Sequence, residues 1–211
     1  MRESLSELLR PKAFADLLQS PSIIKALEVM AANKSPANML FYGSPGLGKT
    51  SAARILLSAL GDNWWEINGS LSTGIDVVRE IETAAGSVGL GEGPRVCFID
   101  EAENLSSSAQ AGLRGLIERV HSHCRFLLTA NDIRKFQPAL RSRFLPVCFD
   151  ISVAEASEVI ARVLPRYVAR LRELNVEIEE QRVRELFHIY FPDLRALANQ
   201  IEFETLHSRA A

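Results

Sequence analysis

The chain has 211 residues, of which 47% are hydrophobic and 24% are charged, and its formal net charge is −2. This composition is typical of a folded globular protein and excludes a disordered chain. No apolar run approaches the roughly 18 residues that a membrane span needs, so we expect no membrane partner. The three cysteines are an odd number at wide spacing, which excludes a disulfide framework and indicates reduced, buried thiols in a cytoplasmic protein.

The even charge balance limits how nucleic acid could be bound. A nearly neutral chain has no bulk attraction to a polyanion. A DNA partner would therefore contact a local patch, or several copies of the chain arranged around it.

Up to residue 150, short apolar segments alternate with helical patterns. A serine and a proline at 20–21 predict the start of the first helix. Apolar strands that alternate with helices predict a parallel sheet covered by helices on both faces. We expect strands at 39–42, 64–67, 95–99, 126–130 and 147–151, helices at 50–60, 75–85 and 107–120, and a Gly-rich connection at 86–94.

After residue 151 only helical patterns follow, at 152–171, 180–190 and 193–207. Pro165 is expected to interrupt the first helix, and Pro192 to lie in the first turn of the last. We expect a base domain at 1–150 and an all-helical domain at 151–211, which is too small for much core of its own and packs on the base domain. Four arginines are expected on its solvated face: Arg162, Arg166, Arg170 and Arg172.

A glycine-rich loop stands between the first predicted strand and the next helix. Its sequence matches the phosphate-binding pattern G-x-x-x-x-G-K-[ST], and this strand-to-helix context supports the match. Backbone N–H groups of such a loop wrap a phosphate, and the helix start adds a favourable dipole. We expect the lysine to contact the terminal phosphates of ATP and the threonine to bind Mg²⁺. The loop consists of Gly43, Ser44, Pro45, Gly46, Leu47, Gly48, Lys49 and Thr50.

Polar residues end two later strands. Asp100 and Glu101 follow an apolar strand, and Asn131 follows the next one. The carboxyl ends of parallel strands meet at one edge of a sheet, so these side chains are expected in one crevice. Asp100 would hold Mg²⁺, Glu101 would polarise the attacking water, and Asn131 would orient that water or the terminal phosphate.

Two arginines, Arg141 and Arg143, precede the last predicted strand. An arginine can stabilise charge on a transferring phosphoryl group and is often supplied by another subunit. A solvated basic turn is an equal alternative from the residues alone.

Several runs, in order along the chain, resemble the sliding-clamp loader branch of the AAA+ ATPases. Arg141-Ser142-Arg143 is similar to the Ser-Arg-Cys motif of that branch, with Phe144 in place of cysteine. The run Phe-Pro-Asp-Leu-Arg at 191–195 is similar to the lid motif with the second sensor arginine, in a spelling closest to bacteriophage loaders. The other runs are 9–14, 66–70, 74–79, 100–105 and 109–114.

The resemblance implies an AAA+ base domain with a helical lid, and ATP bound between them and against a neighbouring subunit. Arg143 would be the arginine finger acting in trans, and Arg195 would reach the phosphates from the lid. Asn68 would be the switch residue that restrains Glu101 until DNA is bound. Further residues implied in coupling to DNA are Gln110 and Arg114, on the linking helix, and Arg79, as a phosphate contact.

The implied partners are other loader subunits in a hetero-pentamer, the sliding clamp, and primer–template DNA at an intracellular replication fork. The family's third, collar domain is not expected within residues 1–211, which indicates either a fragment or a different assembly. Leu71-Ser72-Thr73 departs from the charged loop of the family. Two alternatives remain: another AAA+ motor such as a branch-migration helicase, or a scaffold that binds ATP without hydrolysing it.

Overall fold

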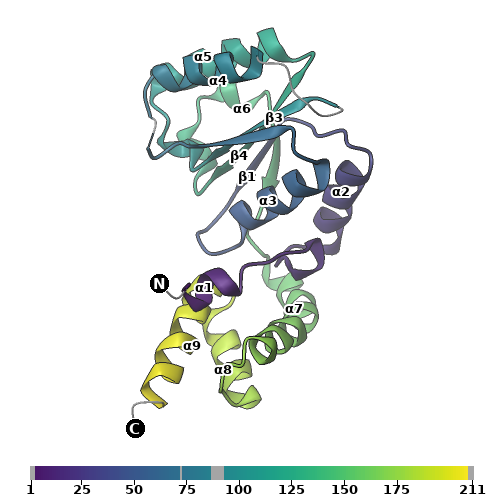
Figure 1. Cartoon of the computed structure of the whole chain (residues 1–211), viewed down its shortest axis with the longest axis vertical. Helices are drawn as coiled ribbons and strands as arrows, with labels where there is room; N and C mark the ends of the chain where they lie inside the picture. Colours follow the sequence, from purple (N-terminus) through teal and green to yellow (C-terminus); the bar gives the residue numbers. More distant parts are fainter. Residues whose placement is uncertain (1–2, 72, 87–92, 209–211) are drawn as a thin grey trace.

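The computed structural model describes residues 3–71, 73–86 and 93–208, so most of the Gly-rich connection at 86–94 lies outside the described residues. A lobe built on a β-sheet stands above a helical lobe (Figure 1). The strands are all parallel, in the order β2-β3-β4-β1-β5, which confirms the predicted sheet. They are β1 (Met39–Tyr42), β2 (Trp64–Asn68), β3 (Arg95–Asp100), β4 (Cys124–Ala130) and β5 (Leu145–Cys148).

The last strand starts and ends earlier than the predicted 147–151. Leu145 pairs with Met39 and Cys148 with Tyr42, so the length of the short strand β1 limits β5. Phe149, just beyond β5, is fully buried against Phe41. Its apolar side chain belongs to the core, and its backbone N still donates a hydrogen bond of 2.7 Å to Tyr42 O at the end of β1. Cys148 is exposed, whereas Cys97 and Cys124 are buried as expected.

Alternate residues of the strands enter two separate cores. Leu40 packs in one core with Ile81 and Leu113, whereas Phe41 packs in the other with Leu56. This follows from the two-residue period of a strand, and it gives each sheet face its own pair of helices. These helices are α2 (Pro21–Ala32), α3 (Lys49–Leu60), α4 (Asp76–Gly86) and α5 (Ser107–Val120).

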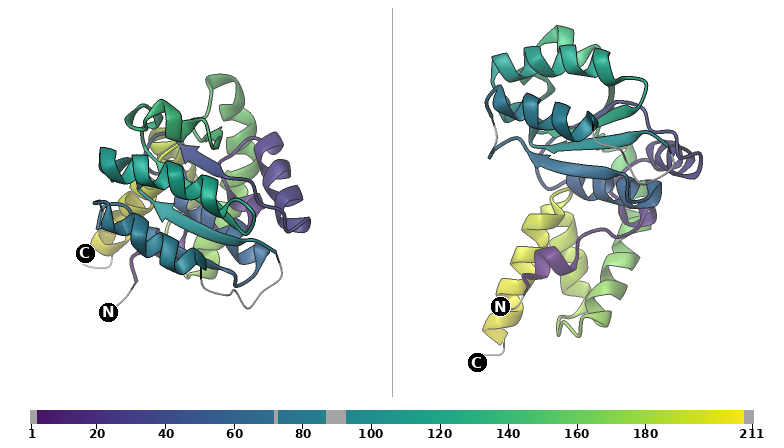
Figure 2. Two further views of the ribbon diagram at one scale, coloured as in Figure 1. Left: turned by 90° about the horizontal axis from the view of Figure 1, so that it is seen from above. Right: turned by 45° about the horizontal axis from the view of Figure 1, so that its top comes forward.

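The helical lobe has a core of its own, contrary to the expectation from its length. Three N-terminal leucines, Leu5, Leu9 and Leu18, are buried in this core although they precede the sheet in the chain. Figure 2 shows the N-terminal segment lying along α9 (Leu194–Ser208), where Leu5 N donates a hydrogen bond of 3.2 Å to Glu202. The lobe contains α1 (Leu5–Leu8), α7 (Val153–Glu173), α8 (Glu180–Tyr190) and α9 (Leu194–Ser208).

The two prolines of this lobe do not act as predicted. Pro165 lies inside α7, which continues through it, and its side chain is exposed. The buried face of α7 outweighs the loss of one helical hydrogen bond. Pro192 lies before α9, which begins at Leu194, because the Asp193 carboxylate caps the backbone N–H groups of Arg195 and Ala196.

The sequence pattern predicted Arg162 on a solvated face. In the structure it connects the two lobes instead. From α7 it donates to the backbone oxygens of Ala15 at 2.9 Å, Leu17 at 2.9 Å and Gln19 at 2.6 Å. Gln19 in turn donates to the carbonyl of Phe149, next to β5, at 3.2 Å. The N-terminal segment therefore bridges the lid and the sheet.

The remaining short elements lie in the connections of the sheet lobe and in the N-terminal segment. They are η1 (Phe14–Asp16), η2 (Ala102–Asn104), η3 (Ile133–Lys135) and α6 (Pro138–Arg141). Within the described part of the chain, no helix is both long and apolar enough to cross a membrane.

Candidate functional site

A cavity opens at the carboxyl edge of the sheet, between the loop after β1, the ends of β3 and β4, and the start of α9. The N-terminal segment closes one side with Leu9, Pro11 and Leu18. An apolar wall beside a polar one suits a molecule with an aromatic base and a charged tail. Its polar wall contains most of the predicted site: Gly46, Gly48, Lys49, Thr50, Asp100, Glu101, Asn131 and Arg195.

The glycine-rich loop folds around the side chain of Lys49. Gly46 and Gly48 have φ of +81° and +80°, which favour glycine. Lys49 is 8% exposed, and its Nζ donates to the carbonyls of Gly43 at 2.7 Å and Ser44 at 2.8 Å. Burial lowers the pKa of Lys49, and the negative charges of Glu103, Asp150 and Asp100 oppose that shift. An anion in the cavity could therefore replace these two carbonyl oxygens as the hydrogen-bond partner of Nζ.

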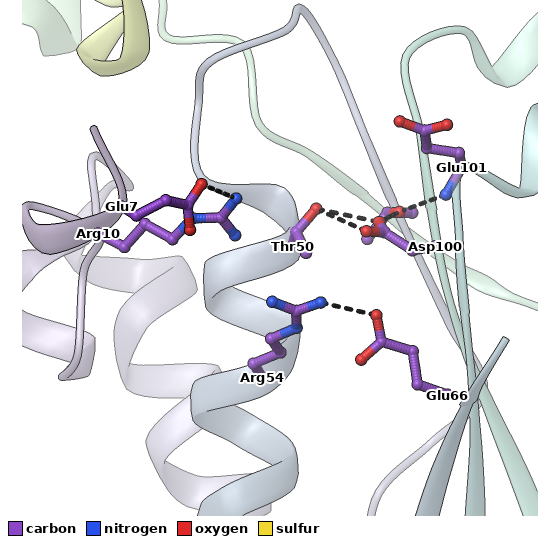
Figure 3. A network of polar contacts seen from close by, with 8 residues as sticks. Glu7, Arg10, Thr50, Arg54, Glu66, Asp100 and Glu101 are labelled. Carbon is purple, nitrogen blue, oxygen red and sulfur yellow. Dashed lines mark hydrogen bonds and ion pairs between the residues drawn. The ribbon is translucent and has the colours of Figure 1, made fainter. Parts of the chain in front are cut away.

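Thr50 and Asp100 face one another across the cavity floor (Figure 3). Thr50 Oγ1 lies 3.0 Å from Asp100 Oδ1. Thr129 also donates to that Oδ1, and its own oxygen accepts from Glu101 N at 3.0 Å. Hydroxyl and carboxylate oxygens are the ligands that Mg²⁺ prefers, so this pair fits the predicted metal role. Thr129 was missed by sequence reasoning, although it is the one polar residue in the apolar strand at 126–130.

Glu101 has φ of +54°, and its carboxylate points away from Asp100 (Figure 3). The Ser70 hydroxyl donates to this carboxylate, and Asn104 Nδ2 donates to Ser70 Oγ at 2.8 Å. Asn68 Oδ1 instead accepts from Ser70 N at 2.8 Å. In this conformation Ser70, two residues beyond the predicted switch residue, makes the contact with Glu101.

Two aspartates to which the sequence assigned no role of their own lie against the glycine-rich loop. Asp150 Oδ1 accepts from Ser44 N at 2.8 Å, and this hydrogen bond lowers the pKa of Asp150. Asp193 of the helical lobe lies against Gly46, where an added Cβ would stand only 2.1 Å from Asp193 Oδ1. The lid carboxylate therefore occupies the space that a side chain at 46 would need.

Seven predicted residues do not line this cavity. Gly43 and Ser44 belong to the glycine-rich loop, and the remaining five lie elsewhere. Arg143 is half-buried at the surface, where its Nε donates to Glu118 at 3.0 Å and lowers the pKa of that carboxyl. Gln110 is 4% exposed and bonds to Leu105 O at 3.1 Å, Lys135 O at 3.2 Å and Gln137 N at 2.9 Å. The other three are exposed: Asn68, Arg79, which pairs with Asp76 at 2.7 Å, and Arg114.

Comparison with known proteins shows the family. Residues 39–149, just over half of the chain, match the family described as ATPase family associated with various cellular activities (AAA). The chain is 31% identical, over 96% of its length, to a replication factor C small subunit of Methanococcus maripaludis, and 30% identical, over 97%, to one of Sulfurisphaera tokodaii. It spans 64% and 63% of the length of these relatives. They confirm the predicted resemblance to the clamp-loader branch.

Solved structures share the fold. The RuvB Holliday junction branch migration motor of Thermotoga maritima matches with a TM-score of 0.63 at 23% identity, over 95% of this chain and 73% of that one. A DNA polymerase III gamma subunit-related protein of the same organism matches with a TM-score of 0.54 at 13% identity, over 87% of this chain and 71% of that one. With the phosphate loop, the acidic strand end and the helical lid in one arrangement, the chain belongs to the AAA family of ATPases.

Proposed function

We propose that this chain hydrolyses ATP with Mg²⁺ as a subunit of a sliding-clamp loader. The observation that carries the proposal is the convergence of Lys49, Thr50, Asp100 and Asn131 on one cavity, with Arg195 facing it from the lid. The named relatives supply the cellular context, because they are replication factor C small subunits.

Each side chain has a task that follows from its chemistry. Lys49 is a buried cation at the base of the loop, where it would neutralise the terminal phosphates. Thr50 and Asp100 would hold Mg²⁺, which supplies charge neutralisation of the phosphates when bound. Glu101 has an exposed carboxylate, held by the Ser70 hydroxyl, that would accept a proton from the attacking water once Ser70 releases it.

The ATP site would be completed by a neighbouring subunit. Arg143 lies at the surface and away from the cavity of its own chain, as a finger acting in trans would require. Its ion pair with Glu118 would be exchanged for a phosphate of the adjacent protomer. The predicted division at residue 150 would then separate a base that binds phosphate from a lid that carries Arg195, with the N-terminal Leu5 and Leu9 packed in the lid core.

A nearly neutral chain could grip DNA in such an array, because several weak patches add along one duplex. Arg79 and Arg114 are exposed and are candidates for such patches. Gln110 connects the helix that carries Arg114 to the segment after Asn131, and would transmit DNA binding to the site.

The test is ATP turnover by the purified chain with its loader partners, measured alone, with clamp, and with clamp plus primed DNA. We expect weak turnover alone and stimulation by clamp and primed DNA together. Glu101→Gln should abolish turnover and retain ATP binding. Absence of stimulation in an assembled complex would reject the loader assignment, and branch migration of a four-way junction would favour the helicase alternative. Unchanged turnover in Glu101→Gln would reject the role of Glu101.

A further inference from the structure

A buried acid stands beside the ATP site, and none of the steps above uses it. Glu103 belongs to η2, lines the cavity and is 8% exposed. Its Oε1 accepts two hydrogen bonds from Asn131, from the backbone N at 3.0 Å and from the side-chain Nδ2 at 2.8 Å. Its Oε2 is buried and has no hydrogen-bond partner among the described residues.

The chemistry at both ends of the Asn131 amide decides which way the amide faces. An ionised carboxylate only accepts hydrogen bonds and an ammonium group only donates them. The Nδ2 of Asn131 must therefore face Glu103, and its Oδ1 must face Lys49, whose Nζ lies 2.9 Å away. If the amide were turned over, two acceptors would meet at one end and two donors at the other.

We infer that Glu103 is a positioning residue that fixes the Asn131 amide with its carbonyl oxygen toward Lys49 and the cavity. The inference rests on the proposed ATP hydrolysis and deepens it. An oxygen at this place accepts a hydrogen bond, so it can hold Lys49 and orient a water molecule through the water's own proton. An NH₂ group there would compete with Lys49 for the same anionic partner and would turn the water the other way.

Two contributions to stability oppose one another at this position. The buried Oε2 without a partner carries a desolvation cost, whereas Oε1 satisfies two Asn131 donors that an apolar side chain would leave unpaired. The second effect of Glu103 is electrostatic. Burial lowers the pKa of Lys49, and the negative charge of Glu103 is the largest contribution that opposes this shift. Orientation and charge are therefore two separable consequences of one side chain.

Two substitutions separate these consequences. Glu103→Gln keeps an acceptor toward both Asn131 donors and removes the charge, whereas Glu103→Leu removes both at similar volume. We expect Glu103→Leu to lower kcat at least tenfold, within the range that a misplaced catalytic group costs, with KM for ATP changed less than about threefold. Glu103→Gln should recover most of that loss. Equal losses in both variants, or full activity in Glu103→Leu, would overturn the inference.

A double-mutant cycle tests whether Glu103 acts through Asn131. In an Asn131→Ala background, Glu103→Leu should change kcat less than about twofold, since residues that act as a unit are not additive. An undiminished further loss would mean that Glu103 acts independently of Asn131, against the inference.

A spectroscopic measurement needs no change at Glu103 and no turnover. The side-chain amide signals of Asn131 are assigned by their disappearance in the Asn131→Ala variant. One of the two Nδ2 protons should be shifted downfield and protected from solvent exchange, as a hydrogen bond to a carboxylate requires. Two freely exchanging protons at ordinary positions would overturn the inference even if Glu103→Leu fails to fold. Loss of clamp stimulation would reject the loader assignment and leave this result intact.

Discussion

The contact between Asp193 and Gly46 makes a sharp prediction about how the lid rests on the phosphate loop. Gly46 and Gly48 have almost the same φ, +81° and +80°, so alanine at either position pays the same left-handed backbone cost, about 1–2 kcal/mol. Their surroundings differ. A Cβ at 46 would stand 2.1 Å from Asp193 Oδ1, whereas a Cβ at 48 would have no atom within 4 Å.

The extra cost at 46 follows from what Asp193 already does. Its Oδ1 accepts from Arg195 N and Ala196 N, both at 3.0 Å, so moving the carboxylate breaks the cap of α9. Loss of such a cap costs about 0.5–2 kcal/mol. We expect Gly48→Ala to lower the free energy of unfolding by about 1–2 kcal/mol, and Gly46→Ala by about 1.5–4 kcal/mol.

The assay is urea denaturation of the nucleotide-free chain, followed by circular dichroism. The matched comparison is the pair of alanine variants, each made with Asp193 present and with Asp193→Ala. In the Asp193→Ala background the difference between the two glycine positions should fall below about 0.5 kcal/mol. Equal destabilisation by both alanines with Asp193 in place would refute the steric reasoning.

Three further predictions concern other contacts. Arg162→Met should lower the free energy of unfolding by about 2–4 kcal/mol, because three carbonyls lose a charged donor. The control is Arg166→Met on the same helix, which should lower it by less than about 1 kcal/mol. Equal urea midpoints for the two variants would contradict this prediction. The lowered pKa of Asp150 means that its stabilisation is present above its ordinary pKa of 3.8 and is lost as pH falls through the lower folded value. The gap in unfolding free energy between wild type and Asp150→Asn should therefore narrow in acid, and a gap that widens below pH 3.8 would oppose the assignment. Arg143→Ala should retain ATP binding and lose most turnover in the assembled complex, while Arg141→Ala, exposed on the same turn, serves as the control.

Much of the sheet lobe could be predicted because its signals are local. Short continuous apolar runs between helical patterns predicted the strands, and the pattern at residues 43–50 predicted the phosphate loop within one continuous segment. Asp100 and Asn131 could be assigned to one edge because parallel strands bring their carboxyl ends together.

What only the tertiary structure decided depends on pairs far apart in the chain. Three contacts leave no periodic pattern in the sequence, since each joins segments that the fold alone brings together. They are the contacts of Asp193 with Gly46, of Arg162 with the carbonyls near Leu17, and of Glu103 with Asn131. The lid core was underestimated for the same reason, because length and composition at 151–211 say nothing of leucines supplied by the N-terminal segment. The sequence by itself therefore determined which chemical groups are available, and the packing of distant segments decided which of them face one another.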